Sequence, residues 1–344
     1  MNPSEATTTD GVRLLSHRPS VLYKVEHLAT EPAVGDIASE GLKLAGPGWS
    51  DRLKSLLLAV SQSERATLLA VRLSDEQALP LPAETLLARE RTDWLPGFLS
   101  RGLMRPHFQP IVDLTSGAVF GREALIRGKL GAVEVRGGEL MAAAEAHDAL
   151  FSFDSRARAA AIEIGLPMLP AGELLFVNLD PRAALDIDTS LRTTWPVIER
   201  MQGDPARLCL ELVRPERYPD RRLLGELVAA HRKHGALIAL DDVSGGSDSL
   251  DLLELLKPDF AKLNMKLISG IESSAGRRRL VAALVECAHE CGARVASVGI
   301  ERVSEFEVMR ELAVDFGQGY YFGHPTERPM DVDARLVHPS RELV

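Results

Sequence analysis

Polar and charged side chains recur along the last two thirds of the chain, each at or just after the end of an apolar run. They are Glu123, Arg127, Asn178, Glu211, Asp241, Asp242, Lys262, Glu301 and Gln318. Carboxylate and amide oxygens are the hard ligands that Mg²⁺ or Mn²⁺ prefers, and acidic groups that face one another need cations to neutralise them. An Arg and a Lys beside such a cluster suggest a phosphate that bridges metal and cation. These residue types therefore predict metal-assisted chemistry on a phosphate-bearing substrate.

Each of these residues also has an ordinary structural interpretation. Asp241 and Asp242 could begin a turn before Ser-Gly-Gly-Ser, and Asn178 before Leu-Asp-Pro could shape another. Lys262 could lie along apolar surface with only its charged end in water. What favours a functional site is the recurrence from run to run, which predicts that these side chains meet at one rim.

The runs that carry these residues predict an α/β fold, because from about residue 105 they alternate with helix-length segments. Eight runs occur, at 107–114, 118–128, 174–181, 208–213, 237–243, 260–264, 293–300 and 316–323. Eight strands in a segment of this length favour a TIM-like (β/α)8 barrel, whose active site lies at the C-terminal strand ends. Only Thr-Ser-Gly separates the first two runs, which is too short for a crossover helix, so the first strand should be antiparallel.

Residues 1–95 predict a separate small α/β domain with a regulatory or interaction role. Strands are expected at 21–28 and 66–74, and a helix at 50–60. The Leu-Pro-Leu-Pro segment at 79–82 breaks this pattern. A connecting helix is expected near 83–103, and the barrel domain at 105–335.

The overall composition predicts a globular protein, since 45% of its 344 residues are hydrophobic and 26% are charged. The net charge of -9 argues against a long nucleic acid as partner. The sequence lacks a signal-peptide pattern and an apolar run long enough to span a bilayer, so we expect a cytoplasmic protein without membrane contact. The Cys287-Ala-His-Glu-Cys291 segment could bind a metal ion, but small buried cysteines in a helix core are the favoured interpretation.

The motifs along the second region resemble those of EAL domains, bacterial phosphodiesterases that cut cyclic di-GMP to linear pGpG with Mg²⁺ or Mn²⁺. The namesake Glu-Ala-Leu occurs at 123–125. Further motifs follow in the family's order and spacing: VNLDP (177–181), LELV (210–213), ALDDVSGGSDSL (239–250), PDFAKLN (258–264), VGIE (298–301) and QGYYFGHP (318–325). The resemblance covers about residues 105–328 and implies a role in cyclic di-GMP signalling.

The resemblance implies a role for each matched residue. A first metal ion would be held by Glu123, Asn178, Glu211 and Asp241. The catalytic groups would be Lys262 beside the attacking water, Asp242 at a second metal ion, and Glu301. The substrate would be contacted by Arg127, Gln318 and Asn264. Family members also commonly pair, which implies a homodimer.

The sequence departs from the family pattern around the second metal ion. The family reads Ala-Glu-Gly-Val-Glu after its seventh strand, and here Val298 replaces the first Glu. The family's Glu-x-Thr-Glu becomes Glu211 to Arg214, which reverses the charge of a residue that anchors the loop after strand five. That loop is altered at Val243, Ser244, Gly245 and Ser247, and Asn264 replaces an Asp.

These departures favour a degenerate EAL domain that binds cyclic di-GMP or a protein partner with little or no hydrolysis. One Mg²⁺ or Mn²⁺ site is expected and the second is in doubt. The first alternative is an active phosphodiesterase in which Asp242, Glu301 or Asp248 supplies the missing ligand. The second is a protein-interaction scaffold that no longer binds the nucleotide.

Overall fold

The structure is a computed structural model that describes residues 10–29, 41–184 and 186–337. The chain divides into two compact units, one formed by residues 1–97 and 142–148 and the other by residues 98–141 and 149–344. Each unit has its own hydrophobic core. No helix in the described ranges is long and apolar enough to cross a membrane.

The N-terminal unit is a four-stranded antiparallel sheet with helices packed on it. The strands, in the order β2-β1-β3-β4, are β1 (Gly11–Ser16), β2 (Leu42–Ala45), β3 (Leu68–Arg72) and β4 (Leu81–Pro82). The helices are α1 (Pro19–Leu28), α3 (Trp49–Ala59), α4 (Gln62–Arg65) and α5 (Ala83–Arg91). The strand predicted at 66–74 and the helix predicted at 50–60 are therefore present, and the unit is a small α/β body.

The strand predicted at 21–28 is wrong, because this segment is helix α1. Pro19 occupies the start of the helix, where its fixed φ is favourable and its missing N–H is not needed. Val21, Leu22 and Val25 are the buried residues of α1. Their i, i+1, i+4 spacing places them on one helix face, whereas Val21, Tyr23 and Val25 recur at every second position, as in a strand.

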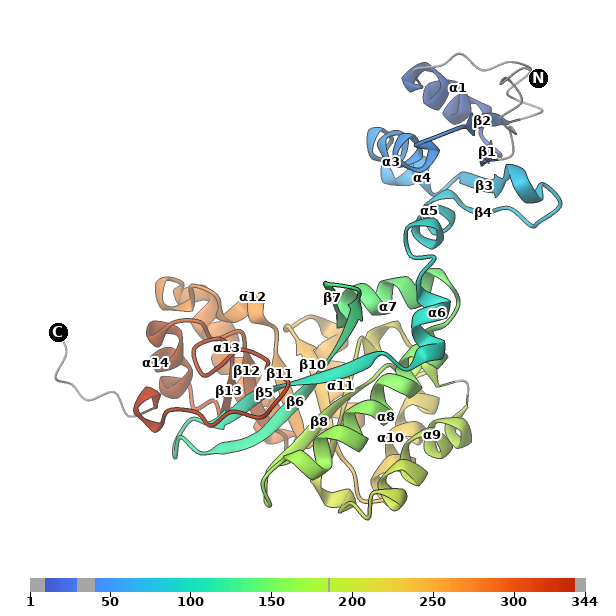
Figure 1. Cartoon of the computed structure of the whole chain (residues 1–344). Coiled ribbons are helices and arrows are strands. Elements are labelled where there is room, and N and C mark those ends of the chain that lie inside the picture. Colours follow the sequence, from blue (N-terminus) through green and yellow to red (C-terminus); the bar gives the residue numbers. More distant parts are fainter. Residues whose placement is uncertain (1–9, 30–40, 185, 338–344) are drawn as a thin grey trace, which may run out of the picture. The chain divides into compact units, whose positions relative to one another are not determined.

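The second unit contains a closed barrel of eight strands surrounded by helices (Figure 1). The barrel strands are β5 (Met104–Asp113), β6 (Val119–Leu130), β8 (Leu174–Leu179), β9 (Leu208–Leu212), β10 (Leu237–Val243), β11 (Phe260–Leu263), β12 (Arg294–Val298) and β13 (Phe316–Gln318). Strand β7 (Val133–Arg136) pairs with β6 outside the barrel. The helices of this region are α6 (Leu95–Arg101), α7 (Gly137–Ala146), α8 (Leu150–Met168), α9 (Ile187–Arg200), α10 (Arg221–Lys233), α11 (Ser247–Leu256), α12 (Met265–Ile268), α13 (Ala275–Glu290) and α14 (Val303–Glu311).

The predicted antiparallel start of the barrel is confirmed. Strand β5 pairs antiparallel with β6 and with β13, and the other neighbouring strands from β6 to β13 pair in parallel. All eight predicted runs contain a barrel strand. The last strand is shorter than the run 316–323, because after Gln318 the chain turns sharply against the end of β12. A Cβ atom at Gly319 would lie only 2.0 Å from the carbonyl oxygen of Ile300.

The lower part of the barrel interior is filled by apolar side chains. The inner cluster consists of Ile111, Phe176, Cys209, Ala239, Phe260, Ala296 and Phe316. Below it, the Arg294 guanidinium lies 4.8, 4.6 and 5.2 Å from the ring centroids of Phe120, Phe260 and Phe316. This cation on three aromatic faces closes the base of the barrel. This end of the barrel is therefore blocked to a ligand.

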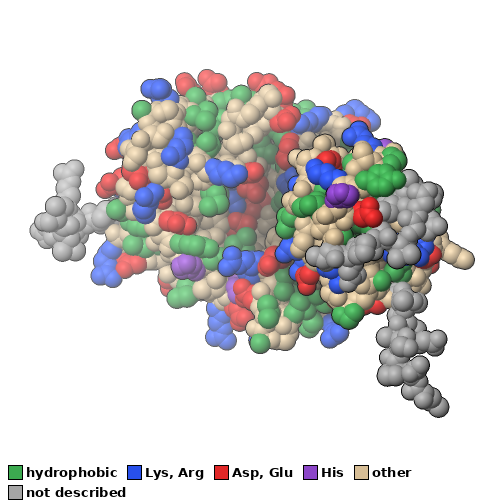
Figure 2. Space-filling view, turned by 90° about the horizontal axis from the view of Figure 1, so that it is seen from above, with side chains coloured by type: hydrophobic (Ala, Val, Ile, Leu, Met, Phe, Trp, Pro, Cys, Tyr) green, Lys and Arg blue, Asp and Glu red, His purple; other side chains and the backbone are tan. Residues whose placement is uncertain are grey.

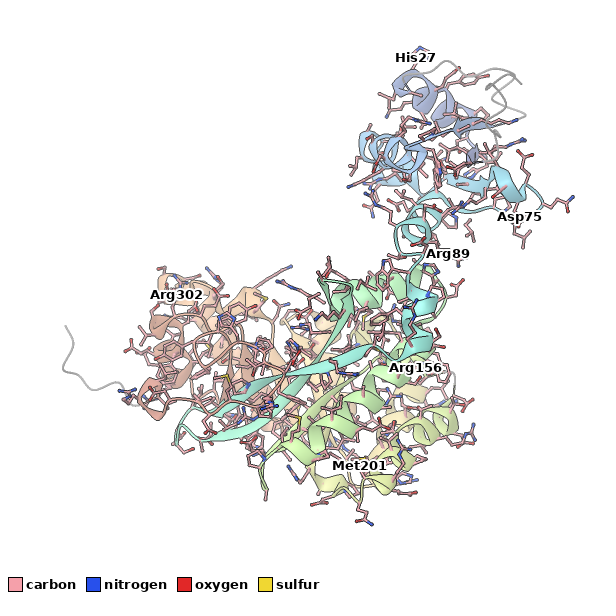
Figure 3. All side chains as sticks on the ribbon, viewed as in Figure 1. His27, Asp75, Arg89, Arg156, Met201 and Arg302 are labelled. Carbon is pink, nitrogen blue, oxygen red and sulfur yellow. The ribbon has the colours of Figure 1, made fainter. Side chains whose placement is uncertain are left out.

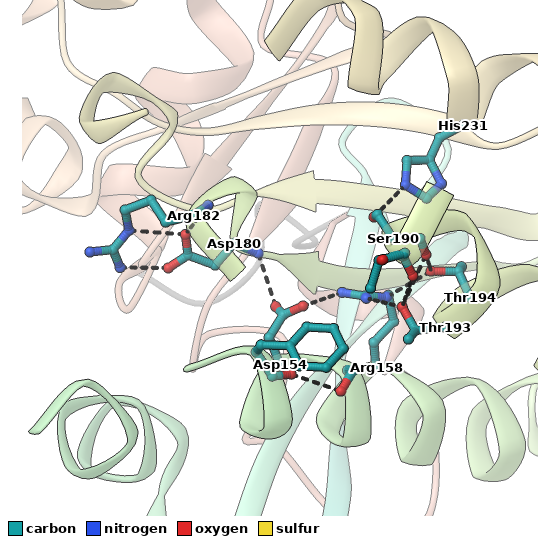
Figure 4. A network of polar contacts seen from close by, with 11 residues as sticks. Asp154, Arg158, Asp180, Arg182, Ser190, Thr193, Thr194 and His231 are labelled. Carbon is teal, nitrogen blue, oxygen red and sulfur yellow. Dashed lines mark hydrogen bonds and ion pairs between the residues drawn. The ribbon is translucent and has the colours of Figure 1, made fainter. Parts of the chain in front are cut away.

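A buried polar network joins α8, α9 and α10 beneath the barrel strands (Figure 4). Arg158 on α8 pairs with Asp154 and donates to Thr194 on α9 at 2.9 Å. Ser190 on α9 lies 2.9 Å from Nε2 of His231 on α10. Burial, with smaller electrostatic contributions from Arg158 and His234, lowers the pKa of His231 to about 3. The imidazole is therefore neutral in the folded protein at neutral pH.

Acidification should destabilise the protein through His231. Its pKa in the folded state is below its ordinary value of 6.5, so the unfolded chain binds the extra proton between pH 6.5 and about 3. Stability from this group is thus complete above pH 6.5, and about 3–5 kcal/mol is lost as the pH falls through that window. Urea unfolding of wild type and His231→Gln at pH 7 and pH 4.5 measures this loss. The wild type should lose more stability than the variant.

His324 provides the control for this experiment, because it is an exposed histidine of the same unit. The His324→Gln variant should follow the wild type at both pH values. An equal loss of stability in wild type and His231→Gln would contradict the assignment of the pH dependence to this imidazole.

Candidate functional site

A ring of inward-facing side chains lies above the apolar layer of the barrel, with one residue from each strand. The ring consists of Gln109, Glu123, Asn178, Glu211, Asp241, Lys262, Val298 and Gln318. On seven of the strands this residue is two positions from a member of the inner apolar cluster, and successive side chains of a strand alternate between its faces. The eighth, Glu123, pairs directly with Gln109. The structure thus brings six of the predicted site residues to the same end of the barrel.

Glu123 accepts hydrogen bonds from three neighbours in this ring. The Lys262 ammonium and the Gln318 amide each donate to Oε2 at 2.8 Å, and the Asn178 amide donates to Oε1 at 3.3 Å. Lys262 also donates to Glu211. Lys262 therefore bridges two carboxylates, and its side chain is only 2% exposed. This arrangement holds the amine between the acids.

The charges of the ring are incompletely balanced, since it contains three carboxylates, of Glu123, Glu211 and Asp241, and one ammonium. Burial and the charge of Glu123 raise the pKa of Glu211 well above its ordinary value, although Lys262 opposes the shift. Burial, against Lys262, also raises the pKa of Asp241. Burial alone would raise the pKa of Glu123, but Lys262 holds it below its usual value. A further cation would relieve the repulsion among these groups.

The donor atoms of the ring fit a divalent cation that prefers oxygen. Glu211 Oε2 is buried and has no hydrogen-bond partner within the described residues, and the same holds for Gln318 Oε1. Glu123, Asn178, Glu211 and Asp241 supply carboxylate and amide oxygens, the ligands that Mg²⁺ and Mn²⁺ favour. As the side chains lie, no three His, Cys, Asp or Glu residues within the described ranges are grouped so that they could hold a metal ion, so Lys262 would have to move away from the carboxylates before a cation binds. Lys262 lies between two of the candidate ligands.

Val298 is the one apolar member of the ring. It follows Ala296, a member of the inner apolar cluster, by two positions and pairs in register with Gln318. Its side chain therefore faces the interior beside the carboxylates, and it offers neither an oxygen ligand nor a proton acceptor. The ring has a gap in its polar lining at this strand.

Two predicted catalytic residues, Asp242 and Glu301, lie outside the ring. Asp242 has a left-handed backbone with φ of 63° and accepts a hydrogen bond from Asn264. Glu301 is exposed, and its backbone N–H donates to Glu305 at 2.9 Å. The adjacent Arg302, which is labelled in Figure 3, also donates to Glu305, at 2.6 Å. Asp248, a further candidate ligand, pairs with Arg221 at 3.1 Å and is exposed.

Arg214 forms an ion pair with a residue just after strand β8 rather than with the loop after β10. Its Nη2 lies 3.6 Å from Oδ2 of Asp180, whose side chain is fully buried, and it also contacts the Met141 sulfur. Arg182 donates to the same Asp180 oxygen at 2.6 Å. The positive charge of Arg214 therefore has a local structural partner in this chain.

Arg127 lies on β6 four residues beyond Glu123, and thus on the same strand face. Its Nε is 3.6 Å from Oε1 of Glu134 on β7. Burial lowers the pKa of Arg127, while Glu134 and Glu123 oppose the shift, but the guanidinium stays charged at any ordinary pH. A permanent cation at the mouth is suited to hold a phosphate.

Sequence reasoning missed Gln109. Its amide oxygen accepts from Gln318 at 3.1 Å, and its own amide donates to the Gly323 carbonyl at 3.2 Å. Because β5 runs antiparallel to its neighbours, its early residues lie at the mouth, whereas the search for polar residues considered only the ends of runs. Applying the expected antiparallel pairing to the first run would have found it.

The EAL domain family model matches residues 92–325. The chain belongs to the EAL domain family. The match includes every residue of the ring and Arg127.

Probable cyclic di-GMP phosphodiesterase PdeB of Escherichia coli is 24% identical over 230 residues, which are 63% of this chain and 41% of that relative. An uncharacterised protein of Azorhizobium caulinodans is 27% identical over 67% of this chain and 32% of its own length. The chain thus spans less than half the length of these two curated relatives.

Two solved EAL structures illustrate the likeness in fold. A standalone EAL protein from Vibrio cholerae, in a form bound to cyclic di-GMP, has a TM-score of 0.60 and 25% identity, covering 68% of this chain and 97% of its own. Klebsiella pneumoniae BlrP1, in a complex with manganese and cyclic di-GMP, has a TM-score of 0.59 and 26% identity over 65% of this chain and 56% of its own. EAL relatives thus bind cyclic di-GMP, and BlrP1 does so with a divalent metal.

Proposed function

We propose that this EAL domain binds cyclic di-GMP through a single divalent cation and hydrolyses it slowly or not at all. The observation that carries the proposal is Val298, which faces the ring where the family pattern has a glutamate. A missing general base typically lowers a rate about 10² to 10⁴-fold, and a lost metal ligand lowers it further. Nucleotide binding depends on groups that this chain retains.

Glu123, Asn178, Glu211 and Asp241 would hold a Mg²⁺ or Mn²⁺ ion, which when bound polarises a phosphoryl oxygen. Arg127 would contact a phosphate oxygen with two parallel hydrogen bonds. Gln318 would position Glu123, to which it donates at 2.8 Å. Lys262, held by Glu123 and Glu211, is placed to stabilise negative charge rather than to accept a proton, because both carboxylates raise its pKa. The chain's own residues thus favour binding over proton abstraction.

Calorimetric titration with cyclic di-GMP in the presence of Ca²⁺ tests this proposal. The wild type should bind, and Glu211→Gln should bind at least about tenfold more weakly, since it loses a charged ligand. Glu226→Gln is the matched control, because Glu226 is an exposed residue of α10 outside the ring, and its affinity should stay within about threefold of wild type. Absence of wild-type binding at high micromolar concentration would contradict the proposal.

The alternative is that the domain is an active phosphodiesterase. Analysis of the reaction products distinguishes this alternative from a domain that only binds the nucleotide. Incubation with cyclic di-GMP and Mn²⁺ should leave the nucleotide intact over a period in which an active relative converts it. Rapid formation of pGpG that Glu123→Ala abolishes would overturn the proposal.

We propose further that the N-terminal unit, residues 1–95, has a regulatory or protein-interaction role, that the domain forms a homodimer, and that the protein acts in the cytoplasm.

A further inference from the structure

The Lys262 ammonium lies between the carboxylates that would hold a divalent cation. It donates to Glu123 Oε2 at 2.8 Å and also to Glu211, and the Lys262 side chain is almost completely buried. Burial disfavours its charge, but Glu123, Glu211 and Asp241 raise the pKa of Lys262 above its ordinary value. The amine is therefore protonated, and the ring contains a cation of its own.

This ammonium and a divalent cation compete for the same oxygen atoms. The three carboxylates of the ring are those of Glu123, Glu211 and Asp241, and all three are candidate ligands of the cation. Two positive ions that share these oxygens would lie close together, where repulsion is strong because little water separates them. Lys262 must therefore leave Glu123 and Glu211 when a cation binds to them.

The ring offers Lys262 no other charged acceptor. On β12, the strand next to β11, the ring residue is Val298, which has no acceptor atom in its side chain. The ring amides, such as Gln318 with its buried Oε1, accept hydrogen bonds but carry no charge. Asp242 and Glu301 lie outside the ring at exposed positions, so an ammonium that reached them would be in water. A displaced ammonium therefore moves toward the mouth of the barrel.

We propose that Lys262 is an exchangeable internal counter-ion. It balances Glu123 and Glu211 until a divalent cation binds to them, and it then moves to a phosphate of the ligand at the mouth. Lys262 is the next-to-last residue of β11, and its flexible four-carbon stem allows this movement. The inference rests on the proposed function, because it concerns the same cation and the same nucleotide.

The exchange makes the binding of the cation and of the nucleotide cooperative. When the cation binds first, Lys262 loses its ion pairs with Glu123 and Glu211 and gains no charged partner. A phosphate supplies that partner, and one charge-assisted hydrogen bond corresponds to a factor of about ten or more in affinity. By linkage, each ligand should tighten the binding of the other by the same factor.

Chemical labelling of the wild-type chain tests the exchange directly. The protein is treated briefly with acetic anhydride, and mass spectrometry measures the acetylated fraction of Lys262. Ca²⁺ should raise this fraction at least about tenfold, because the amine leaves the buried acids, and added cyclic di-GMP should lower it again. Lys233, an exposed lysine at the end of α10, is the internal control, and its labelling should stay constant. A Lys262 fraction that cyclic di-GMP leaves high would overturn the inference.

Replacement of Lys262 by methionine separates the exchange from direct contact between cation and phosphate. Calorimetry with Ca²⁺ alone should show about tenfold tighter binding to Lys262→Met than to wild type, since the competing ammonium is gone. Cyclic di-GMP should then tighten Ca²⁺ binding about tenfold less in the variant than in wild type. Weaker Ca²⁺ binding in a folded Lys262→Met would contradict the exchange. Lys233→Met is the matched control, and labelling of the wild type decides the question if Lys262→Met does not fold.

Three outcomes separate this inference from the proposed function. Binding of cyclic di-GMP while Lys262 stays unlabelled at saturating Ca²⁺ overturns only the exchange. Labelling of Lys262 that Ca²⁺ induces and inorganic phosphate reverses, without any binding of cyclic di-GMP, supports the exchange and overturns the proposed function. Unlabelled Lys262 under all conditions, without nucleotide binding, overturns both.

Discussion

Replacement of Lys262 by methionine should lower the free energy of unfolding by about 3–5 kcal/mol, as expected when one partner of a buried ion pair is removed. Lys262 is 2% exposed and bridges Glu123 and Glu211, and the Glu211 side chain is fully buried. Without the ammonium, at least one of these carboxylates must take up a proton or remain as an uncompensated buried charge. Urea unfolding in the presence of EDTA measures the loss.

Two comparisons make this prediction specific to the buried pair. Lys266→Met removes an exposed lysine of α12 and should change the stability by less than about 0.5 kcal/mol. Adding Glu211→Gln to Lys262→Met should recover part of the loss, because the double variant has one buried charge fewer. A loss below about 1 kcal/mol in Lys262→Met, or no recovery in the double variant, would show that the ammonium does not compensate the acids.

Replacement of Val298 by glutamate should raise the rate of pGpG formation with Mn²⁺ by about 10² or more, the usual effect of a positioned general base. Val298 faces the ring on the strand that contributes no polar group to it. A carboxylate there would add both an oxygen ligand and a proton acceptor. Single-turnover assays with cyclic di-GMP measure the rate.

Val298→Gln is the matched control, since its side chain has the size of glutamate but neither charge nor basicity. It should leave the rate unchanged. The structure argues against adding Arg214→Glu at the same time, because Arg214 lies 3.6 Å from the buried Asp180 carboxylate and a glutamate there would repel it. An unchanged rate of pGpG formation in a stably folded Val298→Glu variant would mean that another departure from the family pattern limits hydrolysis.

The sequence was sufficient to predict the barrel and the gathering of its polar strand ends, because both follow from periodicity and from the parallel arrangement of strands. Asn178, Glu211 and Lys262 illustrate this, since each is the next-to-last residue of a short apolar strand. Helix α1 was mistaken for a strand because ten residues are too few for their period to be unambiguous.

Contacts between side chains were beyond sequence reasoning. That Lys262 lies between Glu123 and Glu211 depends on closure of the barrel, which brings strands β6, β9 and β11 around one axis. The sequence likewise could not show that Asp242 accepts a hydrogen bond from Asn264 rather than pointing into the barrel, because this depends on the left-handed backbone at Asp242. The ion pair between Arg214 and Asp180 likewise depends on the pairing of β8 with β9.

The cation at the base of the barrel gives the interior an electrical direction. Arg294 carries a permanent positive charge on one side of the aromatic layer, and the carboxylates of the ring lie on the other. The apolar layer keeps these opposite charges apart along the barrel axis, whereas side chains of both charges are interspersed on the face of the molecule seen in Figure 2. At the open end the carboxylates lie beside Arg127, a permanent cation. The entrance therefore presents both signs of charge, and a divalent ion and the phosphate that it neutralises are drawn to neighbouring side chains.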